Sequence, residues 1–212
     1  MTAGVQSHWD GIYDARPDEE LTWFESTPSL SYALVTRHLR PGDAFIDVGG
    51  GTSRLVDFLL KEGFGPLAVL DVSTSALAAC RDSLGKRGDE VTWIAADVTS
   101  WQPDKPYTVW HDRAVFHFLT APNDRAAYAR TMAEALRPGG VAVIATFADD
   151  GPEMCSGLPV VRYAPDALVQ EFDGLIPGKL ELMEAKRHMH VTPTGNRQSF
   201  QYSVFRKVSE AA

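Results

Sequence analysis

A strand pattern that runs directly into three glycines is the feature that most constrains how this chain can fold. Residues 45–53 read Phe-Ile-Asp-Val-Gly-Gly-Gly-Thr-Ser, and a helical pattern follows. About twenty residues later, residues 67–71 form a second apolar strand that ends in Asp71. Glycines let a ligand approach the backbone, the helix N-terminus points toward it, and an acid at the next strand tip can hold two ribose hydroxyls. The pattern predicts a site for a nucleoside-containing cofactor.

The spacing of the glycines indicates which cofactor this is. A dinucleotide site requires Gly-x-Gly-x-x-Gly, but Arg54 stands where the third glycine belongs. The Gly-x-x-x-x-Gly-Lys-[Ser/Thr] run of a phosphate-binding loop is also absent from the sequence. A cofactor without a pyrophosphate fits better, and S-adenosylmethionine is the common one. For the glycines taken alone, a tight turn that binds no ligand is the alternative.

Composition and charge narrow the class of function. The chain has 212 residues, enough for one α/β domain with a full core. Its formal net charge of −8 disfavours a nucleic-acid substrate, which would require a basic patch. The two cysteines, Cys80 and Cys155, form neither a disulfide framework nor a metal-binding spacing, so we expect a reducing, cytoplasmic location. Neither a signal peptide nor a membrane-spanning apolar run is recognisable, so we expect no membrane association.

Strand patterns alternate with helical patterns along most of the chain. This alternation predicts a Rossmann-like, doubly wound α/β fold with a mostly parallel, seven-stranded sheet. The last two strands follow one another without a clear helix between them, which suggests an antiparallel C-terminal end. The strands are expected at residues 44–48, 67–71, 91–95, 108–111, 141–146, 179–184 and 198–204. We expect one domain over 1–212, with a lid and helix in 1–40, a cofactor-binding core in 41–150, and an acceptor loop and closing strands in 151–212.

Polar side chains fall at the ends of these expected strands. They are Asp47, Asp71, Asp97, His111 and Thr146. Ligands of doubly wound sheets bind beyond the carboxyl ends of the strands, so these residues lie where that rule requires them.

The glycine-rich run resembles motif I of the class I S-adenosylmethionine-dependent methyltransferases, usually acidic-x-Gly-x-Gly-x-Gly, with Ser53 in place of the last glycine. Asp71 matches the acid that binds the ribose hydroxyls in this family, and Ala96-Asp97-Val98 matches the acidic motif after the third strand. Leu136-Arg137-Pro138-Gly139-Gly140 is similar to the turn before the fifth strand. The resemblance covers residues 8–205 and implies an S-adenosylmethionine site, with S-adenosylhomocysteine as the product, formed by Trp23, Asp47, Gly49, Gly50, Gly51, Ser53, Asp71, Val72, Ser73, Asp97, Val98 and His111.

Two further segments resemble the thiopurine and plant thiol methyltransferases. Trp110-His111-Asp112-Arg113-Ala114 is similar to a Trp-Asp-Arg-Gly/Ala segment, and Gly157-Leu158-Pro159-Val160 is similar to a Gly-Pro-Pro-Tyr/Phe loop. The start, from His8-Trp9-Asp10 to Trp23-Phe24, instead resembles a group of eukaryotic protein-lysine methyltransferases. That group carries Lys-Gly-Thr where this chain has His-Asp-Arg, which favours the first comparison.

Residues that follow the fourth and fifth strands are candidates for the acceptor site. His111, Asp112, Arg113 and His117 form the catalytic set: the arginine fork can bind an anionic acceptor, and a histidine can accept a proton. Asp112 and Arg113 can instead pair with each other or cap the next helix. The residues expected to contact the acceptor are Arg113, Cys155, Leu158, His188 and His190. We expect no metal, because the histidine spacing is not a ligand signature.

The N-terminal segment is rich in aromatic residues. Trp9, Tyr13, Trp23 and Phe24 can form a lid that excludes water, and an aromatic face attracts a sulfonium. Packing of the same rings into the core is the alternative, and Trp23 is the expected cofactor contact.

The leading hypothesis is methyl transfer to a small-molecule acceptor. Because the sulfonium donor is already activated, alignment supplies much of the rate, and a thiol, with a pKa of about 8.5, ionises in part without a base. A thiol or another soft nucleophile is therefore the expected acceptor. A protein-lysine N-methyltransferase and a non-catalytic S-adenosylmethionine-binding module are the alternatives. The chain is expected to be a monomer or a homodimer.

Overall fold

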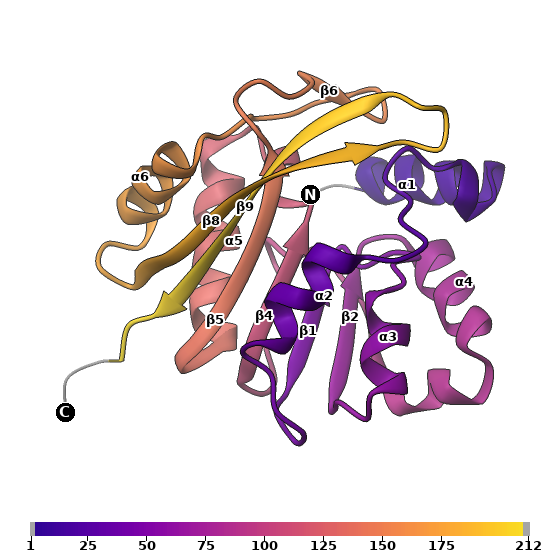
Figure 1. Cartoon of the computed structure of the whole chain (residues 1–212), viewed down its shortest axis with the longest axis horizontal. Helices are drawn as coiled ribbons and strands as arrows, with labels where there is room; N and C mark the ends of the chain where they lie inside the picture. Colours follow the sequence, from indigo (N-terminus) through magenta and orange to yellow (C-terminus); the bar gives the residue numbers. More distant parts are fainter. Residues whose placement is uncertain (1–2, 210–212) are drawn as a thin grey trace.

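The computed structural model describes residues 3–209 and contains a seven-stranded sheet in the order β3-β2-β1-β4-β5-β9-β8. The strands are β1 (Phe45–Val48), β2 (Leu67–Asp71), β3 (Val91–Ala95), β4 (Tyr107–Arg113), β5 (Leu136–Phe147), β8 (Leu180–Val191) and β9 (Arg197–Lys207). Strands β1 to β5 are parallel, and β9 pairs antiparallel with both β5 and β8. The predicted sheet, with its antiparallel C-terminal end, is confirmed (Figure 1).

Helices cover both faces of the sheet. They are α1 (Ala3–Ala15), α2 (Ser29–Thr36), α3 (Leu55–Lys61), α4 (Thr74–Leu84), α5 (Pro122–Ala135) and α6 (Pro165–Leu175), with the 3-10 turns η1 (Asp18–Glu20), η2 (Gly85–Glu90) and η3 (Phe116–Phe118). One core contains apolar side chains of α2, α3 and α4, and the other contains those of α5 and α6. Neighbouring strand residues alternate between these cores, so Phe45 and Val109 join the first while Ile46 and Trp110 join the second.

The structure extends several predicted strands. β4 continues to Arg113 because Asp112 and Arg113 pair with Ile144 and Ala145 of β5. Residues 137–140, predicted as a turn, belong to β5, and the β4–β5 register shifts nearby between Tyr107 and Val109. Pairing with a neighbouring strand extends these segments beyond their apolar cores. The longer β4 decides which of its polar residues face the same side of the sheet.

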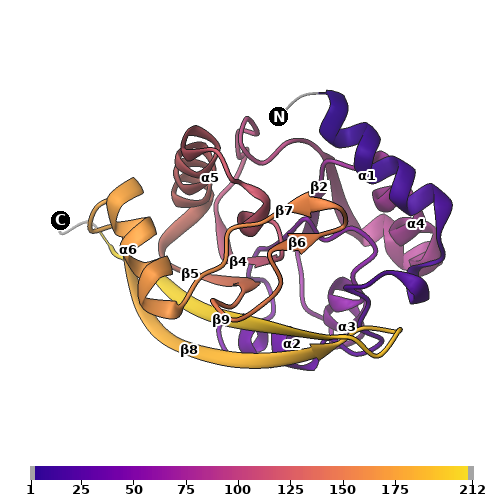
Figure 2. The same ribbon diagram turned by 90° about the horizontal axis from the view of Figure 1, so that it is seen from above.

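The N-terminal helix lies against α4 at one side of the sheet. In Figures 1 and 2, α1 lies beside α4, and hydrogen bonds join the two. Asp10 Oδ1 accepts from Ser73 Oγ at 2.7 Å and from the Ser75 backbone N–H at 3.2 Å. The aspartate thereby caps the N-terminus of α4, where its negative charge is favourable. Within residues 3–209, no helix has the length and apolar character that crossing a membrane requires.

A small hairpin lies over the carboxyl end of the sheet. Its strands, β6 (Met154–Cys155) and β7 (Leu158–Pro159), pair antiparallel, and Figure 2 shows the hairpin above the ends of the central strands. The segment predicted as the acceptor loop is therefore an ordered turn that projects over this edge.

Candidate active site

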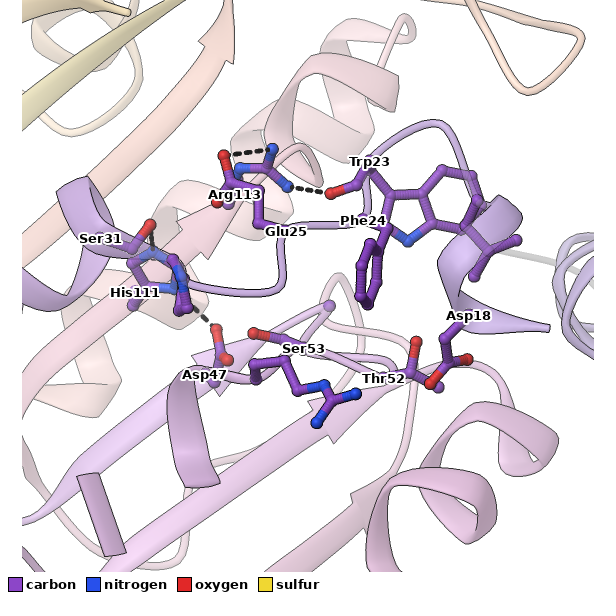
Figure 3. A pocket seen from close by; sticks show the side chains of 15 residues that line it. Asp18, Trp23, Phe24, Glu25, Ser31, Asp47, Thr52, Ser53, His111 and Arg113 are labelled. Atoms are coloured by element: carbon purple, nitrogen blue, oxygen red, sulfur yellow. Dashed lines mark hydrogen bonds and ion pairs between the residues drawn. The ribbon is translucent and has the colours of Figure 1, made fainter. Parts of the chain in front are cut away.

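A pocket lies at the carboxyl ends of β1 and β4, beneath residues 18–28, which we call the strap (Figure 3). The empty space inside it measures about 560 Å³, including the open solvent at its mouth. Strand ends, the glycine turn, the strap and α2 all contribute to its walls. The lining residues are Asp18, Leu21, Trp23, Phe24, Glu25, Pro28, Ser31, Asp47, Gly49, Gly50, Thr52, Ser53, Arg54, His111 and Arg113.

The glycine turn forms the floor of this pocket. Gly49 has φ +63°, and a Cβ atom there would overlap Val115 Cγ2. A Cβ at Gly50 would lie 2.7 Å from Val69 Cγ1, which is also too close for any side chain. Only glycine fits at these positions, so the backbone itself faces the ligand.

Asp47 and His111 form a buried polar pair beside this floor. The two residues are register partners on β1 and β4. His111 Nδ1 donates to Asp47 Oδ1 at 2.7 Å, and His111 Nε2 lies 2.9 Å from Ser31 Oγ of α2. Asp47 Oδ2 is buried and has no hydrogen-bond partner among the described residues. A buried carboxylate oxygen without a donor is costly, so this atom fits a cationic donor of a ligand.

Asp71 orders the backbone next to the pocket. Its carboxylate accepts from the Gly51 N–H at 2.9 Å and from the Ser73 N–H at 2.8 Å. Burial raises the pKa of Asp71 to about 6, although these backbone hydrogen bonds lower it. A Cβ atom at Gly51 would overlap the Tyr13 hydroxyl, and it would lie 3.5 Å from Asp71 Oδ2. Helix α1 thus covers the carboxylate that the sequence assigns to the ribose.

A second polar group in the pocket is Arg113, at the end of β4. Its Nη1 donates to the Trp23 carbonyl of the strap at 2.9 Å, and its Nη2 lies 3.2 Å from Glu25 Oε1. His190 Nδ1 and His188 Nε2 of β8 face the same oxygen at 3.4 and 3.7 Å. Burial alone would raise the pKa of Glu25, but the hydrogen bond from His190 and the charge of Arg113 bring it below its ordinary value.

Comparison with known proteins decides the family. A family model described as a methyltransferase domain matches residues 45–140, which include the glycine turn and Arg113. Thiocyanate methyltransferase 1 of Arabidopsis thaliana is 27% identical over 190 residues, covering 87% of this chain and 80% of that protein. The chain is a class I S-adenosylmethionine-dependent methyltransferase.

Solved structures share the fold of this methyltransferase. One, described as converting a disulfide bond into a thioacetal group during echinomycin biosynthesis, has a TM-score of 0.75 and 22% identity, covering 97% of this chain and 94% of that chain. Another is the 1,6-didemethyltoxoflavin-N1-methyltransferase of Burkholderia thailandensis with bound 1,6-didemethyltoxoflavin and S-adenosylhomocysteine. Its TM-score is 0.69 and its identity 18%, covering 97% of this chain and 86% of that chain.

The methyltransferase brings together only some of the predicted cofactor residues. Of that set, the residues that line the pocket are Trp23, Asp47, Gly49, Gly50, Ser53 and His111. Gly51, Asp71 and Ser73 lie next to it, where Tyr13 and Asp10 of α1 contact them.

The remaining predicted cofactor residues follow β2 and β3. Val72 is partly exposed after β2, and Val98 is buried in the core. Asp97 accepts from the Thr99 backbone N–H at 2.9 Å and from its hydroxyl at 2.7 Å, which orders the turn after β3. None of the three is among the residues that line the pocket.

Asp112 lies on the opposite face of β4 from the pocket, because successive strand residues alternate in direction. Its carboxylate accepts from the backbone N–H groups of Val115 at 2.8 Å and Phe116 at 3.0 Å, and from the Tyr128 hydroxyl at 2.5 Å. Burial raises the pKa of Asp112 to about 6. These contacts match the helix-capping alternative, and they correct the placement of Asp112 beside the acceptor.

His117 is fully buried below the hairpin. Its Nδ1 accepts from the Phe147 backbone N–H at 3.2 Å. Burial, with a further contribution from the charge of Arg113, lowers the pKa of His117 to about 3. At neutral pH the ring is therefore uncharged and carries its proton on Nε2, so this atom is a donor. The expectation that His117 accepts a proton has no support in this geometry.

The predicted acceptor residues divide into two groups. Arg113, His188 and His190 meet at Glu25, as described above. Cys155 and Leu158 lie in the β6–β7 hairpin and do not line the pocket. Burial raises the pKa of the Cys155 thiol to about 11, so the thiol is protonated at neutral pH. No group of three His, Cys, Asp or Glu side chains within residues 3–209 is arranged to hold a metal ion.

The sequence missed the polar residues that the strap contributes. Asp18 and Glu25 line the pocket, as do Ser31 and Thr52. The one available signal is the position of Glu25 directly after the Trp23-Phe24 pair, which was already expected to lie near the cofactor.

Proposed function

We propose that this methyltransferase methylates a small-molecule acceptor through a thiolate or another soft anionic nucleophile. Arg113 carries the proposal, because it places a permanently charged guanidinium in the pocket beside the cofactor floor. His188 and His190 add two further nitrogen-bearing side chains around the single carboxylate of Glu25. An anion that takes the place of the Glu25 carboxylate would meet the charge of Arg113, whereas the ammonium group of a lysine side chain would be repelled by it.

The residues present fit the cofactor. The buried Asp47 Oδ2, which has no partner among residues 3–209, would accept from the ammonium group of S-adenosylmethionine. The backbone at Gly49 and Gly50 would lie along its methionine part, and Asp71 would hold the ribose hydroxyls once the Tyr13 hydroxyl shares or leaves that position. Bound there, S-adenosylmethionine supplies an activated methyl group on a sulfonium.

The protein's own contribution is alignment and charge. The Trp23 and Phe24 rings would exclude water and present aromatic faces to the sulfonium. Arg113 would favour the ionised form of a thiol, because a positive charge nearby lowers the pKa of an acid. The thiol proton would then leave to solvent before methyl transfer, so the reaction requires no dedicated base.

Two of the similar proteins favour sulfur as the accepting atom. The Arabidopsis relative is named for thiocyanate, a sulfur-containing acceptor. The description of the echinomycin structure concerns a disulfide and a thioacetal, which are also sulfur groups.

Methyl-labelled S-adenosylmethionine tests the proposal. The purified protein would be incubated with a panel of small thiols, matched amines and a protein fraction, and label would be followed in each. We expect label in thiols, with turnover rising with pH as the thiol ionises. Label confined to amines or to a protein band would reject the proposal, and the latter would favour the lysine alternative. Binding of the cofactor without label in any fraction would favour a non-catalytic module.

A further inference from the structure

We propose that Arg113, His188 and His190 form a carboxylate-binding site for the acceptor, and that Glu25 occupies this site with its own carboxylate until the acceptor displaces it. The inference rests on the proposed function and names the acceptor class: a small molecule that carries a carboxylate next to its soft nucleophile. Glu25 then makes the enzyme selective for acceptors whose carboxylate can displace its own.

The convergence of three side chains on one atom is the first argument. The three groups face a single oxygen atom, Glu25 Oε1. It lies 3.2 Å from Arg113 Nη2, 3.4 Å from His190 Nδ1 and 3.7 Å from His188 Nε2. Arg113 comes from the end of β4, while both histidines come from the edge strand β8. His188 and His190 are two residues apart on that strand, so they share one face. The fold thus brings two histidine rings and the charged Arg113 together from distant parts of the chain, and a strap carboxylate fills the space between them.

The incompletely paired edge of the Arg113 guanidinium is the second argument. Arg113 Nε and Nη2 are both buried, and neither makes a hydrogen bond of good geometry among the described residues, although Nη2 is ion-paired with Glu25 and the guanidinium also interacts with the Tyr202 hydroxyl. These two nitrogens form the edge of a guanidinium that binds a carboxylate through two parallel hydrogen bonds. Glu25 therefore neutralises the charge of Arg113 but does not make the two parallel hydrogen bonds that this edge of the guanidinium can donate. A carboxylate on a free ligand can align with both nitrogens.

The way the strap is held is the third argument, because it lets Glu25 move alone. Arg113 Nη1 donates to the Trp23 carbonyl at 2.9 Å, and His190 Nε2 bonds the Thr22 carbonyl at 2.8 Å. The other nitrogens of the same two side chains face Glu25. A ligand can replace the Glu25 carboxylate while both carbonyl contacts hold the strap. Rotation of one side chain is sufficient, and the strap stays docked.

Acetate, the shortest mimic of the Glu25 carboxylate group, is a direct probe. Its affinity for the S-adenosylhomocysteine complex would be measured by calorimetry for the wild type, for Glu25→Gln and for Glu20→Gln. Glu20 is the matched control, since it belongs to the same strap but its side chain is exposed and does not line the pocket. Removing the competing charge should tighten acetate binding about tenfold or more in Glu25→Gln and leave Glu20→Gln like the wild type. The gain should disappear in Glu25→Gln/Arg113→Gln.

Unchanged or weaker acetate binding by Glu25→Gln would overturn the proposal, and so would an equal gain in Glu20→Gln. Melting curves establish that each variant is folded. If Glu25→Gln fails to fold, Glu25→Asp serves in its place, because it draws the carboxylate back by one methylene and should also bind acetate more tightly. Acetate binding requires no turnover. Failure of the thiol assay together with a gain in acetate affinity would therefore reject the proposed acceptor atom and leave the carboxylate site intact.

Discussion

Asp47 and His111 lie side by side on neighbouring parallel strands and share a hydrogen bond of 2.7 Å. Both are almost fully buried, at 2% exposure each, and His111 also contacts Ser31 of α2. The pair connects the first acid of the glycine motif to the helix that follows the strap. It fixes one oxygen of Asp47 and leaves the other without a hydrogen-bond partner among the described residues.

His111→Phe should destabilise the protein and weaken its binding of S-adenosylhomocysteine. The ring shape is kept, but a buried Asp47 oxygen loses its donor, at a cost of about 1–3 kcal/mol. His111→Asn is the matched variant, because its amide can still donate to Asp47. Urea denaturation and calorimetry should place His111→Asn between the wild type and His111→Phe. A His111→Phe protein as stable and as tightly binding as the wild type would show that the pair has no such role.

Gly51→Ala should destabilise the protein through a contact with Tyr13. Gly51 and Gly63 both have positive φ, +47° and +76°, so alanine strains the backbone at either site by about 1–2 kcal/mol. Only at Gly51 would the new methyl group also overlap the Tyr13 hydroxyl, since nothing lies within 4 Å of a Cβ at Gly63. Denaturation should therefore show a larger loss of unfolding free energy for Gly51→Ala than for Gly63→Ala. Adding Tyr13→Phe to Gly51→Ala should restore part of this loss. If the effects of the two substitutions on the unfolding free energy simply add, the contact between the two residues is contradicted.

Arg113→Lys should lower turnover far more than cofactor affinity. Lysine keeps the charge but lacks the planar fork, so it cannot hold both the Trp23 carbonyl and an anion in the same geometry. We expect a loss of about tenfold to a hundredfold in kcat/KM, or 1.4 to 2.8 kcal/mol. Calorimetry with S-adenosylhomocysteine should show a smaller change. An equal loss in both measurements would place Arg113 in the cofactor site.

Asp112→Asn should change how stability depends on pH. The pKa of Asp112 is about 6 in the folded protein and about 3.9 when unfolded, so the folded state holds the proton more tightly. Its contribution is fully present below pH 3.9 and is lost as the pH rises to 6. The stability advantage of the wild type over Asp112→Asn should therefore shrink by about 2 kcal/mol between pH 4 and pH 7. Parallel pH curves for the two proteins would contradict the raised pKa.

Local patterns were sufficient to place the strands and the floor of the pocket. β2 and β3 begin and end at the predicted residues, and Asp47, Gly49 and Gly50 of the glycine motif line the pocket. Their positions follow from short-range rules: apolar runs form strands, and a glycine turn precedes a helix. These rules act over a few residues and can be read directly along the chain.

Other features follow only from contacts between distant segments. Extended pairing of β4 with β5 turns Asp112 away from the pocket, although its neighbours His111 and Arg113 face it. Two of the three ionic partners of Glu25 lie on β8, near the other end of the chain, and the third, Arg113, ends β4. The sequence by itself determined the fold class, the cofactor and the glycine floor, because local periodicity and turn chemistry encode them. Only the tertiary structure decided which charged side chains lie next to one another, because the length of a strand and its pairing with neighbouring strands set the direction of each side chain.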